Sequence, residues 1–406
     1  MSMTVYDRDR GTVILNPEQE ALVEKIKDWY YHSPEQTFQF SGAAGTGKST
    51  VIIAAINALK LQANEVAPMS FIGAATVVMR IKGLWNAKTI HSWLYEPYEV
   101  KGDFDSYLNR NRMKLDFKRK PLDPGIKLIV VDEAAAVPGY LRKAIESENR
   151  KVLVCGDVNQ LPPFGGVTDD TYLYHGKVEY LTQIMRQNSN STIPRFADEI
   201  LHGIWHVRGM YGNVCVMYDD EVTDEFLANM EVILCHTNAK RDEYNRRIRE
   251  DIFGFHGPLP QHGEKLICRK NNWGSEVNGI SLTNGLIGTV CNYPSVGDFD
   301  GKTFGLDFKP NLSSEPFFGL KADYNYFTAP DNVIRNKIKN DPLSDGDKFE
   351  FAYALTVHVA QGSQYSVGAY IWSKTFHEED QINLDYTAVT RFVDRCFIII
   401  PREFHY

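Results

Sequence analysis

One glycine-rich stretch constrains the fold of this chain more than any other feature. The sequence FSGAAGTGKSTVI spans Phe40 to Ile52 and contains Gly42, four further residues, and then Gly47, Lys48 and Ser49. This spacing is that of a phosphate-binding P-loop, in which backbone N–H groups surround an anion and glycine adopts conformations that a Cβ would forbid. The lysine of such a loop reaches the β- and γ-phosphates, and the hydroxyl coordinates Mg²⁺. The stretch therefore predicts binding of ATP and Mg²⁺.

The residues on either side of the loop support this interpretation. Thr37 to Phe40 alternates and is β-prone, whereas Thr50 to Leu61 is rich in Ala, Ile and Leu and contains neither Gly nor Pro. A strand that leads through a glycine loop into a helix is the context that a P-loop requires. The alternative is a glycine turn with an ordinary surface lysine. The predicted ATP-binding residues are Gly42, Ala43, Ala44, Gly45, Thr46, Gly47, Lys48, Ser49 and Thr50, with Ser49 also a Mg²⁺ ligand.

The composition is that of a globular protein. The 406 residues are 43% hydrophobic and 24% charged, which suffices for two or three domains with cores of their own. No apolar run approaches the roughly 20 residues of a membrane span, and the N-terminal residues include early acidic charges. We expect a cytoplasmic protein (in the host cytoplasm if it is viral) without a membrane partner. Six cysteines without any Cys-x-x-Cys pair favour buried free thiols over a zinc site or disulfides.

The net charge of −8 argues against a generally basic surface but leaves room for a local basic groove. Basic residues gather in two islands, RNRMKLDFKRK at residues 110–120 and RRIR at residues 246–249. Charge alone favours solvated faces for both of them.

A second motif supplies candidates for the metal ligand and the catalytic base. Ile126 to Val131 is an apolar run interrupted only by Lys127, as expected for a strand buried on both faces of a parallel sheet, and Asp132 and Glu133 follow it. Ligands of open α/β sheets bind at the carboxyl ends of the strands. We expect Asp132 to hold Mg²⁺ and Glu133 to polarise the attacking water. Two solvated acids at a strand end are the alternative.

A third predicted strand ends in another polar loop. The sequence KVLVCGDVNQLPP covers residues 151–163 and includes Gly156, Asp157 and Gln160. A glutamine at this position is able to hydrogen-bond the γ-phosphate or the attacking water without a change of charge. By itself, Gly-Asp after a strand is also ordinary turn chemistry.

Six motifs in order resemble those of the superfamily 1 helicases, and most of all the RecD-like and Dda-like branch, which moves 5′ to 3′ on single-stranded DNA. They are GAAGTGKST, VVDEAA, CGDVNQLPP, LTQIMRQ, LTVHVAQGSQY and DYTAVTR. The resemblance spans Gln19 to Arg391. It implies an α/β fold with two RecA-like P-loop domains built on parallel sheets.

The resemblance also implies roles for individual residues. Gln19 reads the adenine, Glu133 is the catalytic base, Gln160 contacts the γ-phosphate, and Arg186 and Arg391 are arginine fingers. A planar guanidinium suits the equatorial oxygens of a phosphoryl group in its transition state. The implied DNA contacts are Thr76, His91, Trp93, Tyr95, Thr356, His358 and Gln361.

Two positions depart from the family pattern, and both lie in segments expected to touch DNA. Ala75 precedes Thr76 where the family often has proline, and Val359 follows His358 where it usually has lysine. The loss of a cation at Val359 puts one phosphate contact in doubt. The ATPase motifs therefore match the family better than the DNA groove does.

The chain divides into two predicted RecA-like domains, each with an insertion. The first covers residues 1–192 and the second covers residues 193–256 and 349–406. Residues 93–125 interleave aromatics with the first basic island, which suits base stacking or a subdomain core, and the family places a duplex-splitting hairpin there. Residues 257–348 show closely spaced turn signals that predict a small β barrel, and NGLIG resembles the start of the family's SH3-like barrel.

These motifs favour an ATP-dependent 5′-to-3′ DNA helicase with single-stranded and forked DNA as partners. Roles in DNA replication, recombination or repair, together with proteins of those processes as partners, are consistent with this class. One alternative is a DNA-stimulated ATPase that displaces bound proteins, and another is a nucleotide-dependent switch without a nucleic-acid track. The sequence specifies no sugar, so RNA stays open as a substrate.

Overall fold

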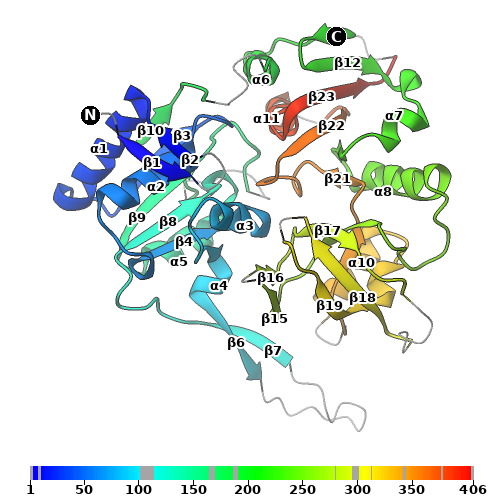
Figure 1. Cartoon of the computed structure of the whole chain (residues 1–406), viewed down its shortest axis with the longest axis horizontal. Helices are drawn as coiled ribbons and strands as arrows, with labels where there is room; N and C mark the ends of the chain where they lie inside the picture. Colours follow the sequence, from blue (N-terminus) through cyan, green and yellow to red (C-terminus); the bar gives the residue numbers. More distant parts are fainter. Residues whose placement is uncertain are drawn as a thin grey trace. The chain divides into compact units, whose positions relative to one another are not determined.

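The computed structural model describes residues 3–7, 11–100, 114–163, 170–185, 191–278, 280–294, 301–311, 313–341, 344–375 and 378–403. The chain forms two compact units. Unit 1 consists of Met1–Leu94, Pro121–Val222 and Ala360–Tyr406, and unit 2 consists of Tyr95–Lys120 and Thr223–Val359. Figure 1 traces the elements of both units along the chain.

A parallel sheet forms the centre of unit 1. Its strand order is β10-β3-β9-β8-β4-β5, and each neighbouring pair is parallel. The apolar, β-branched run before Asp132 forms a strand here because both faces of the sheet are covered, and Leu128 to Val131 are all buried. The strands are β3 (Thr37–Gly42), β4 (Val66–Ser70), β5 (Lys88–Thr89), β8 (Leu128–Asp132), β9 (Lys151–Gly156) and β10 (Val178–Leu181).

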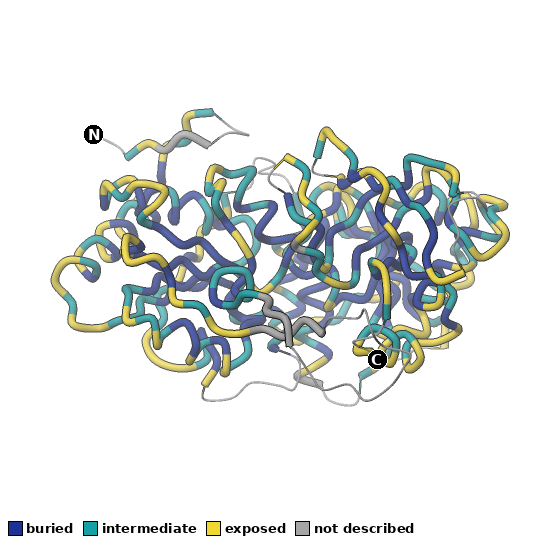
Figure 2. The backbone as a smooth tube through the Cα atoms, turned by 90° about the horizontal axis from the view of Figure 1, so that it is seen from below, coloured by how far each residue is buried: buried dark blue, intermediate teal, exposed yellow. Residues whose placement is uncertain are grey.

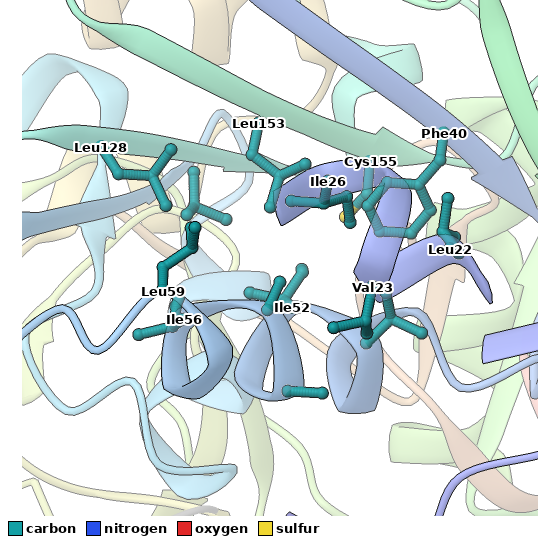
Figure 3. Packing of buried hydrophobic residues seen from close by; sticks show 14 of the residues in the cluster. Leu22, Val23, Ile26, Phe40, Ile52, Ile56, Leu59, Leu128, Leu153 and Cys155 are labelled. Atoms are coloured by element: carbon teal, nitrogen blue, oxygen red, sulfur yellow. The ribbon is translucent and has the colours of Figure 1, made fainter. Parts of the chain in front are cut away.

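Two helices pack on this sheet and on each other. Helix α1 (Pro17–His32) begins at a capping box, in which the Asn16 side chain accepts from the Gln19 backbone N–H and the Gln19 side chain accepts from the Asn16 N–H. Helix α2 (Lys48–Ala58) follows the glycine loop directly. Figure 3 shows Ile52 and Ile56 of α2 pointing toward Leu128 and Leu153, with Ile26 and Phe40 beside Cys155. This apolar cluster fixes the P-loop helix against the strands.

The rest of unit 1 includes a second set of parallel strands. Strand β23 lies between β12 and β22 and is parallel to both, and β11 pairs antiparallel with β12. Helices α6 and α11 pack together beside β23. These elements are β11 (Gly209–Tyr211), β12 (Val214–Tyr218), β22 (Tyr365–Ile371), β23 (Phe392–Ile400), α6 (Ile193–Leu201) and α11 (Glu378–Val389). The remaining ones are β1 (Thr4–Asp7), β2 (Gly11–Ile14), α3 (Gly73–Ile81), α4 (Ile90–Leu94), α5 (Gly139–Glu146), η1 (Ala63–Glu65), η2 (Ala134–Ala136) and η3 (Asp219–Glu221).

Unit 2 combines one parallel strand pair with a mainly antiparallel region. Strands β13 (Val232–Cys235) and β21 (Ala354–Thr356) are parallel neighbours. An antiparallel sheet has the order β19-β18-β17-β14-β20. Its strands are β14 (Lys265–Cys268), β17 (Ile287–Val290), β18 (Thr303–Pro310), β19 (Phe317–Asp323) and β20 (Phe349–Phe351). The other elements are β15 (Asn272–Val277), β16 (Ile280–Leu282), α7 (Asp224–Ala228), α8 (Asn238–Arg246), η4 (Arg247–Ile252), α9 (Tyr324–Phe327) and α10 (Asn332–Asn340).

The first predicted insertion contains a hairpin. Strands β6 (Tyr95–Val100) and β7 (Lys114–Arg119) pair antiparallel in register from Tyr95↔Arg119 to Val100↔Lys114. Residues 101–113, which hold part of the first basic island, lie outside the described residues. Trp93 belongs to α4, just before the hairpin begins.

The predicted α/β class with parallel sheets is confirmed. Figure 2 colours the backbone by burial and shows buried stretches of chain separated by exposed residues. The antiparallel region at residues 265–351 lies where the β insertion is predicted, but closure as an SH3-like barrel and the domain boundaries stay predictions. Four of the six free cysteines are buried, namely Cys155, Cys235, Cys268 and Cys396. Within the described ranges, no helix combines the length and apolarity that a membrane span needs.

Candidate active site

The P-loop joins the end of β3 to the start of α2. Gly45 and Gly47 both have positive φ angles, at 89° and 86°, so glycine is required at these turns. The Thr46 hydroxyl donates to the Ala43 carbonyl at 3.0 Å and closes the loop upon itself. In the described part of the chain, no side chain caps the N-terminus of α2, whose first N–H groups and positive dipole end suit an anion.

The Lys48 ammonium lies against the same loop. Its Nζ donates to the carbonyl oxygens of Gly42 and Ala43 at 2.6 and 3.3 Å. Both acceptors are neutral, so the positive charge of the lysine is solvated by the loop without being neutralised. A cation held in this way at a helix N-terminus is suited to phosphate.

Gln19 is held against the P-loop backbone. The side-chain Nε2 donates to the Thr46 carbonyl at 3.0 Å, while Oε1 takes part in the capping box of α1. A Cβ at Gly47 would lie 2.4 Å from Gln19 Nε2, so the close approach of the two segments requires glycine. The structure thus places Gln19 at the nucleotide loop, and its contact with adenine stays a prediction.

The acidic motif lies at the end of β8, as expected. Asp132 Oδ1 accepts the Glu133 backbone N–H at 2.9 Å and the Cys155 thiol at 3.0 Å. Glu133 has a φ of 52°, in the left-handed region that non-glycine residues seldom adopt. Such strain at a candidate catalytic residue is typical of functional sites, because the surrounding structure must hold it in place.

The electrostatics around Glu133 bring together residues from distant parts of the sequence. Burial raises the pKa of the Glu133 carboxyl, and the neighbouring Asp132 and Asp157 raise it further. The Arg391 guanidinium and the Lys48 ammonium act in the opposite direction and lower this pKa. A half-buried carboxyl under the electrostatic influence of two cations and two other acids suits phosphoryl-transfer chemistry.

Arg391 reaches this site from the end of α11. It is buried, and its guanidinium donates to the carbonyls of Thr387 and Ser363 and to the Thr390 hydroxyl at 3.2, 3.4 and 3.3 Å. All three acceptors are neutral. The second predicted arginine finger, Arg186, lies outside the described residues; the residue before it, Met185, donates its backbone N–H to the Gly45 carbonyl at 2.8 Å.

Three hydrogen bonds link the loop after β9 with the segments at residues 361 and 386–387. The Tyr386 hydroxyl donates to Asp157 Oδ2 at 2.7 Å, and the Thr387 hydroxyl accepts the Leu161 N–H at 2.9 Å. Gln361 Nε2 donates to the Leu161 carbonyl at 3.1 Å. Gln160 lies in this linked segment and is buried, and its contact with the γ-phosphate stays a prediction.

Sequence reasoning missed several residues that the structure brings to the site. Tyr386 and Thr387 stand within the quoted motif DYTAVTR, so their position in it was a usable signal. Cys155 likewise stands within the quoted motif CGDVNQLPP, whereas Lys82 lies in none of the quoted motifs. Lys82 Nζ donates to the Ser49 hydroxyl at 3.2 Å.

The donor set at the site fits Mg²⁺. Ser49 and Asp132 offer a hydroxyl and a carboxylate, and Mg²⁺ prefers oxygen ligands in combination with substrate phosphates. Ser49 is the second residue of α2, beside Lys48, and Asp132 is the last residue of β8, directly before Glu133. These two side chains would hold the ion, which would neutralise part of the phosphate charge.

The predicted DNA contacts occupy varied environments. Thr76 is buried in α3, where its hydroxyl donates to the Gly73 carbonyl at 2.7 Å, and Thr356 is buried in β21. The Trp93 indole N–H donates to the Pro68 carbonyl at 2.8 Å, which anchors the ring to unit 1. Their roles toward DNA, and those of Tyr95 and Gln361, stay predictions.

Two of these predicted contacts are histidines. Burial lowers the pKa of His91, whose ring lies 6.2 Å from that of Phe71. Desolvation of the His358 ring and the charge of the nearby His236 lower the pKa of His358. Both rings are therefore weaker bases than a free histidine, and their contact with DNA stays a prediction.

The second basic island has a structural explanation. Arg246 lies near Glu250 and Asp251, Arg247 pairs with Asp224, and Arg249 is buried against Glu264. The expected solvated face is observed for Arg246, which is exposed, whereas Arg249 is buried because Glu264 neutralises its charge.

Comparison with known proteins agrees with this geometry. Residues 14–207 match the model of the AAA domain family. A relative, the uncharacterized protein MJ1519 of Methanocaldococcus jannaschii, is 22% identical over 98% of this chain. The chain spans 39% of the length of that protein.

Solved structures share the fold across nearly the whole chain. The Pif1 helicase from Candida albicans has a TM-score of 0.56 at 17% identity and covers 97% of this chain and 95% of its own. Pif1 helicase from Bacteroides, in a complex with ADP-AlF3 and single-stranded DNA, has a TM-score of 0.55 at 15% identity, with 96% and 95% covered. The fold of this chain is therefore similar to that of these solved Pif1 helicases.

Proposed function

We propose that this chain is an ATP-dependent DNA helicase that moves 5′ to 3′ on single-stranded DNA and separates duplex DNA. The observation that best supports the proposal is that the charges of both Lys48 and Arg391 act on the half-buried carboxyl of Glu133. The P-loop binds the phosphates, Glu133 takes a proton from the attacking water, and Arg391 stabilises charge in the transition state. Ser49 and Asp132 hold Mg²⁺ in this scheme.

The fold supports DNA as the partner. The Bacteroides relative was solved with single-stranded DNA, and another Pif1 structure concerns unwinding at forked double-stranded DNA. In this chain, the segment that includes Gln361 is hydrogen-bonded to the loop after β9, near the candidate phosphate sensor Gln160. A link of this kind connects ATP chemistry to a segment predicted to bind DNA.

The decisive experiment measures ATP hydrolysis with and without single-stranded DNA, and unwinding of duplexes that bear either a 5′ or a 3′ tail. We expect DNA to stimulate hydrolysis and only the 5′-tailed duplex to be separated. Unwinding of the 3′-tailed duplex alone would contradict the proposed direction. A single-stranded RNA of equal length tests the choice of sugar in the same assay.

The β6–β7 hairpin is proposed to split the duplex. The register of its two strands defines which residues to delete. Because Val100 and Lys114 form the last pair, residues 101–113 can be replaced by Asn-Gly, which favours a tight hairpin turn. We expect DNA-stimulated hydrolysis to persist and unwinding to be lost, since Lys48, Glu133 and Arg391 lie elsewhere. Unwinding at the parent rate would exclude the wedge and favour the alternative of an ATPase that displaces bound proteins.

A further inference from the structure

Cys155 occupies a position between the apolar core and the acidic motif. It is the fifth residue of β9 and is fully buried. Strands β8 and β9 are parallel neighbours with Val131 opposite Val154, so Asp132 and Cys155 follow next along the two strands. Figure 3 shows Cys155 in the core cluster beside Phe40. The strand register therefore places this thiol beside the carboxylate at the end of β8.

The thiol contacts one particular oxygen of Asp132. Cys155 Sγ lies 3.0 Å from Oδ1, and the Glu133 backbone N–H donates to this same oxygen at 2.9 Å. One donor comes from the end of β8 and the other from the neighbouring strand. These two hydrogen bonds orient the Asp132 carboxylate, and both are accepted by Oδ1 rather than by Oδ2.

The surrounding packing holds the two strand ends close together. A Cβ on Gly156 would lie 3.0 Å from the Ala134 backbone nitrogen and 2.7 Å from Leu173 Cδ1. Glycine at this position therefore allows the end of β9 to approach the turn that follows Glu133. The Cys155 hydrogen bond belongs to a tightly packed junction, where side-chain positions are well determined.

We propose that Cys155 is a positioning residue, whose thiol orients the Asp132 carboxylate for the divalent cation that accompanies the nucleotide. This inference rests on the proposed function. Carboxylates that bind metals are themselves hydrogen-bonded, and loss of such an outer partner typically lowers metal affinity about 10- to 100-fold. An apolar side chain at position 155 would leave Oδ1 with only the Glu133 N–H.

The test measures metal binding directly. Mn²⁺ substitutes for Mg²⁺, and its binding to the protein with ADP is followed by electron paramagnetic resonance. We expect Cys155→Ala to weaken Mn²⁺ binding about 10- to 100-fold. ADP affinity in the presence of a chelator should not change, because the P-loop is untouched. Cys155→Ser keeps a donor and should bind Mn²⁺ more tightly than Cys155→Ala.

Cys396→Ala provides the matched control. Cys396 is a buried cysteine of β23 in the same unit, so the substitution makes the same chemical change outside the site. It should leave Mn²⁺ affinity at the parent value. If Cys155→Ala does not fold, Cys155→Val fills the volume without a donor and should show the same loss of Mn²⁺ affinity.

The outcomes separate this inference from the proposed function. Parent-like Mn²⁺ affinity in folded Cys155→Ala or Cys155→Val would overturn the positioning role, while the ATPase assignment would stand. Absence of Mn²⁺ and ADP binding in the parent chain would overturn the proposed function itself.

Discussion

In unit 2, buried cations lie against carboxylates, whereas in the candidate active site of unit 1 the cations donate to neutral oxygens. Lys348 contacts Asp323 at 2.7 Å, Arg241 contacts Glu350 at 2.9 Å, and all four side chains are buried. Lys48 and Arg391 instead donate to carbonyls and a hydroxyl. Among the described residues, neither of these two cations forms an ion pair.

The ion-paired charges of unit 2 stabilise the fold, whereas the charges of Lys48 and Arg391 are suited to bind an anionic ligand. In a buried ion pair each charge neutralises the other, and removal of one partner leaves an uncompensated charge. Cations solvated only by neutral oxygens keep their charge available to a polyanion such as ATP. We therefore expect substitutions in unit 1 to affect catalysis, and substitutions in unit 2 to affect stability.

The largest effect is expected for Arg391→Ala. Arginine fingers contribute about 10³ to 10⁵ in rate, so ATP turnover should fall by that order while nucleotide affinity changes little. Arg391→Lys should recover only part of the rate, because an ammonium lacks the planar fork. Steady-state ATPase assays and fluorescent-nucleotide titrations measure both quantities.

The control for this substitution is Arg395→Ala, at an exposed arginine of β23. It should leave turnover unchanged. Unchanged turnover in Arg391→Ala would remove Arg391 from the site and weaken the contrast between the two units.

Glu133→Gln is expected to have the next largest effect. General-base catalysis contributes about 10² to 10⁴ in rate, and an amide is unable to accept the proton of the attacking water. The variant should still bind ATP, because Lys48 and the P-loop are intact. Rapid-quench measurement of a single turnover separates binding from hydrolysis.

Glu24→Gln, at an exposed glutamate of α1, makes the same carboxyl-to-amide change away from the site. It should hydrolyse ATP at the parent rate. Near-normal turnover by Glu133→Gln would show that another group serves as the base.

In unit 2, Lys348→Met should lower stability by about 3–5 kcal/mol, because it leaves Asp323 buried without its cation. Urea denaturation measures the free energy of unfolding. Nucleotide affinity well below the unfolding transition should remain that of the parent, since the P-loop, Asp132 and Arg391 all belong to unit 1.

The double variant Lys348→Met, Asp323→Asn provides the control for this pair. It removes the orphaned charge and keeps an oxygen for the Tyr326 N–H that Asp323 caps. Its stability should recover much of the loss. Equal stability of the parent and Lys348→Met would mean that the pair does not stabilise unit 2.

The smallest effect concerns Asp385, a buried acid of α11 in unit 1. Burial raises the pKa of Asp385 to about 7, although Tyr370, Gln381 and Trp372 donate hydrogen bonds to it. Between the ordinary value of 3.8 and about 7, the folded state binds more protons than the unfolded state. The contribution of Asp385 to stability is therefore present at low pH and is lost as pH rises through this window.

Asp385→Asn should remove this pH dependence. Relative to the parent, the variant should gain up to about 1.4 kcal/mol per pH unit between pH 5 and 7, measured by urea denaturation. Asp380→Asn, at an exposed position of α11, should follow the parent curve. Parallel curves for the parent and Asp385→Asn would show that Asp385 titrates near its ordinary value.

The local features of the site follow from short stretches of the sequence alone. The spacing from Gly42 to Ser49 requires a loop between a strand and a helix, and the apolar run before Asp132 requires a buried strand. Both follow from short-range rules on backbone conformation and hydrophobic patterning. The order of the motifs also indicates the fold, and it predicts that Arg391 is an arginine finger.

Contacts between groups that are distant in the sequence become apparent only in the folded chain. Cys155 contacts Asp132 because β8 and β9 are neighbouring strands in a particular register. The sequence of neither strand specifies which strand lies next to it. The pKa of Glu133 depends on burial and on Arg391, and both arise only when the chain is folded. Arg247 and Arg249 belong to a basic island in the sequence, but their acidic partners, Asp224 and Glu264, are supplied by other segments of unit 2. Contacts between segments far apart in the chain depend on packing, and local patterns do not encode them.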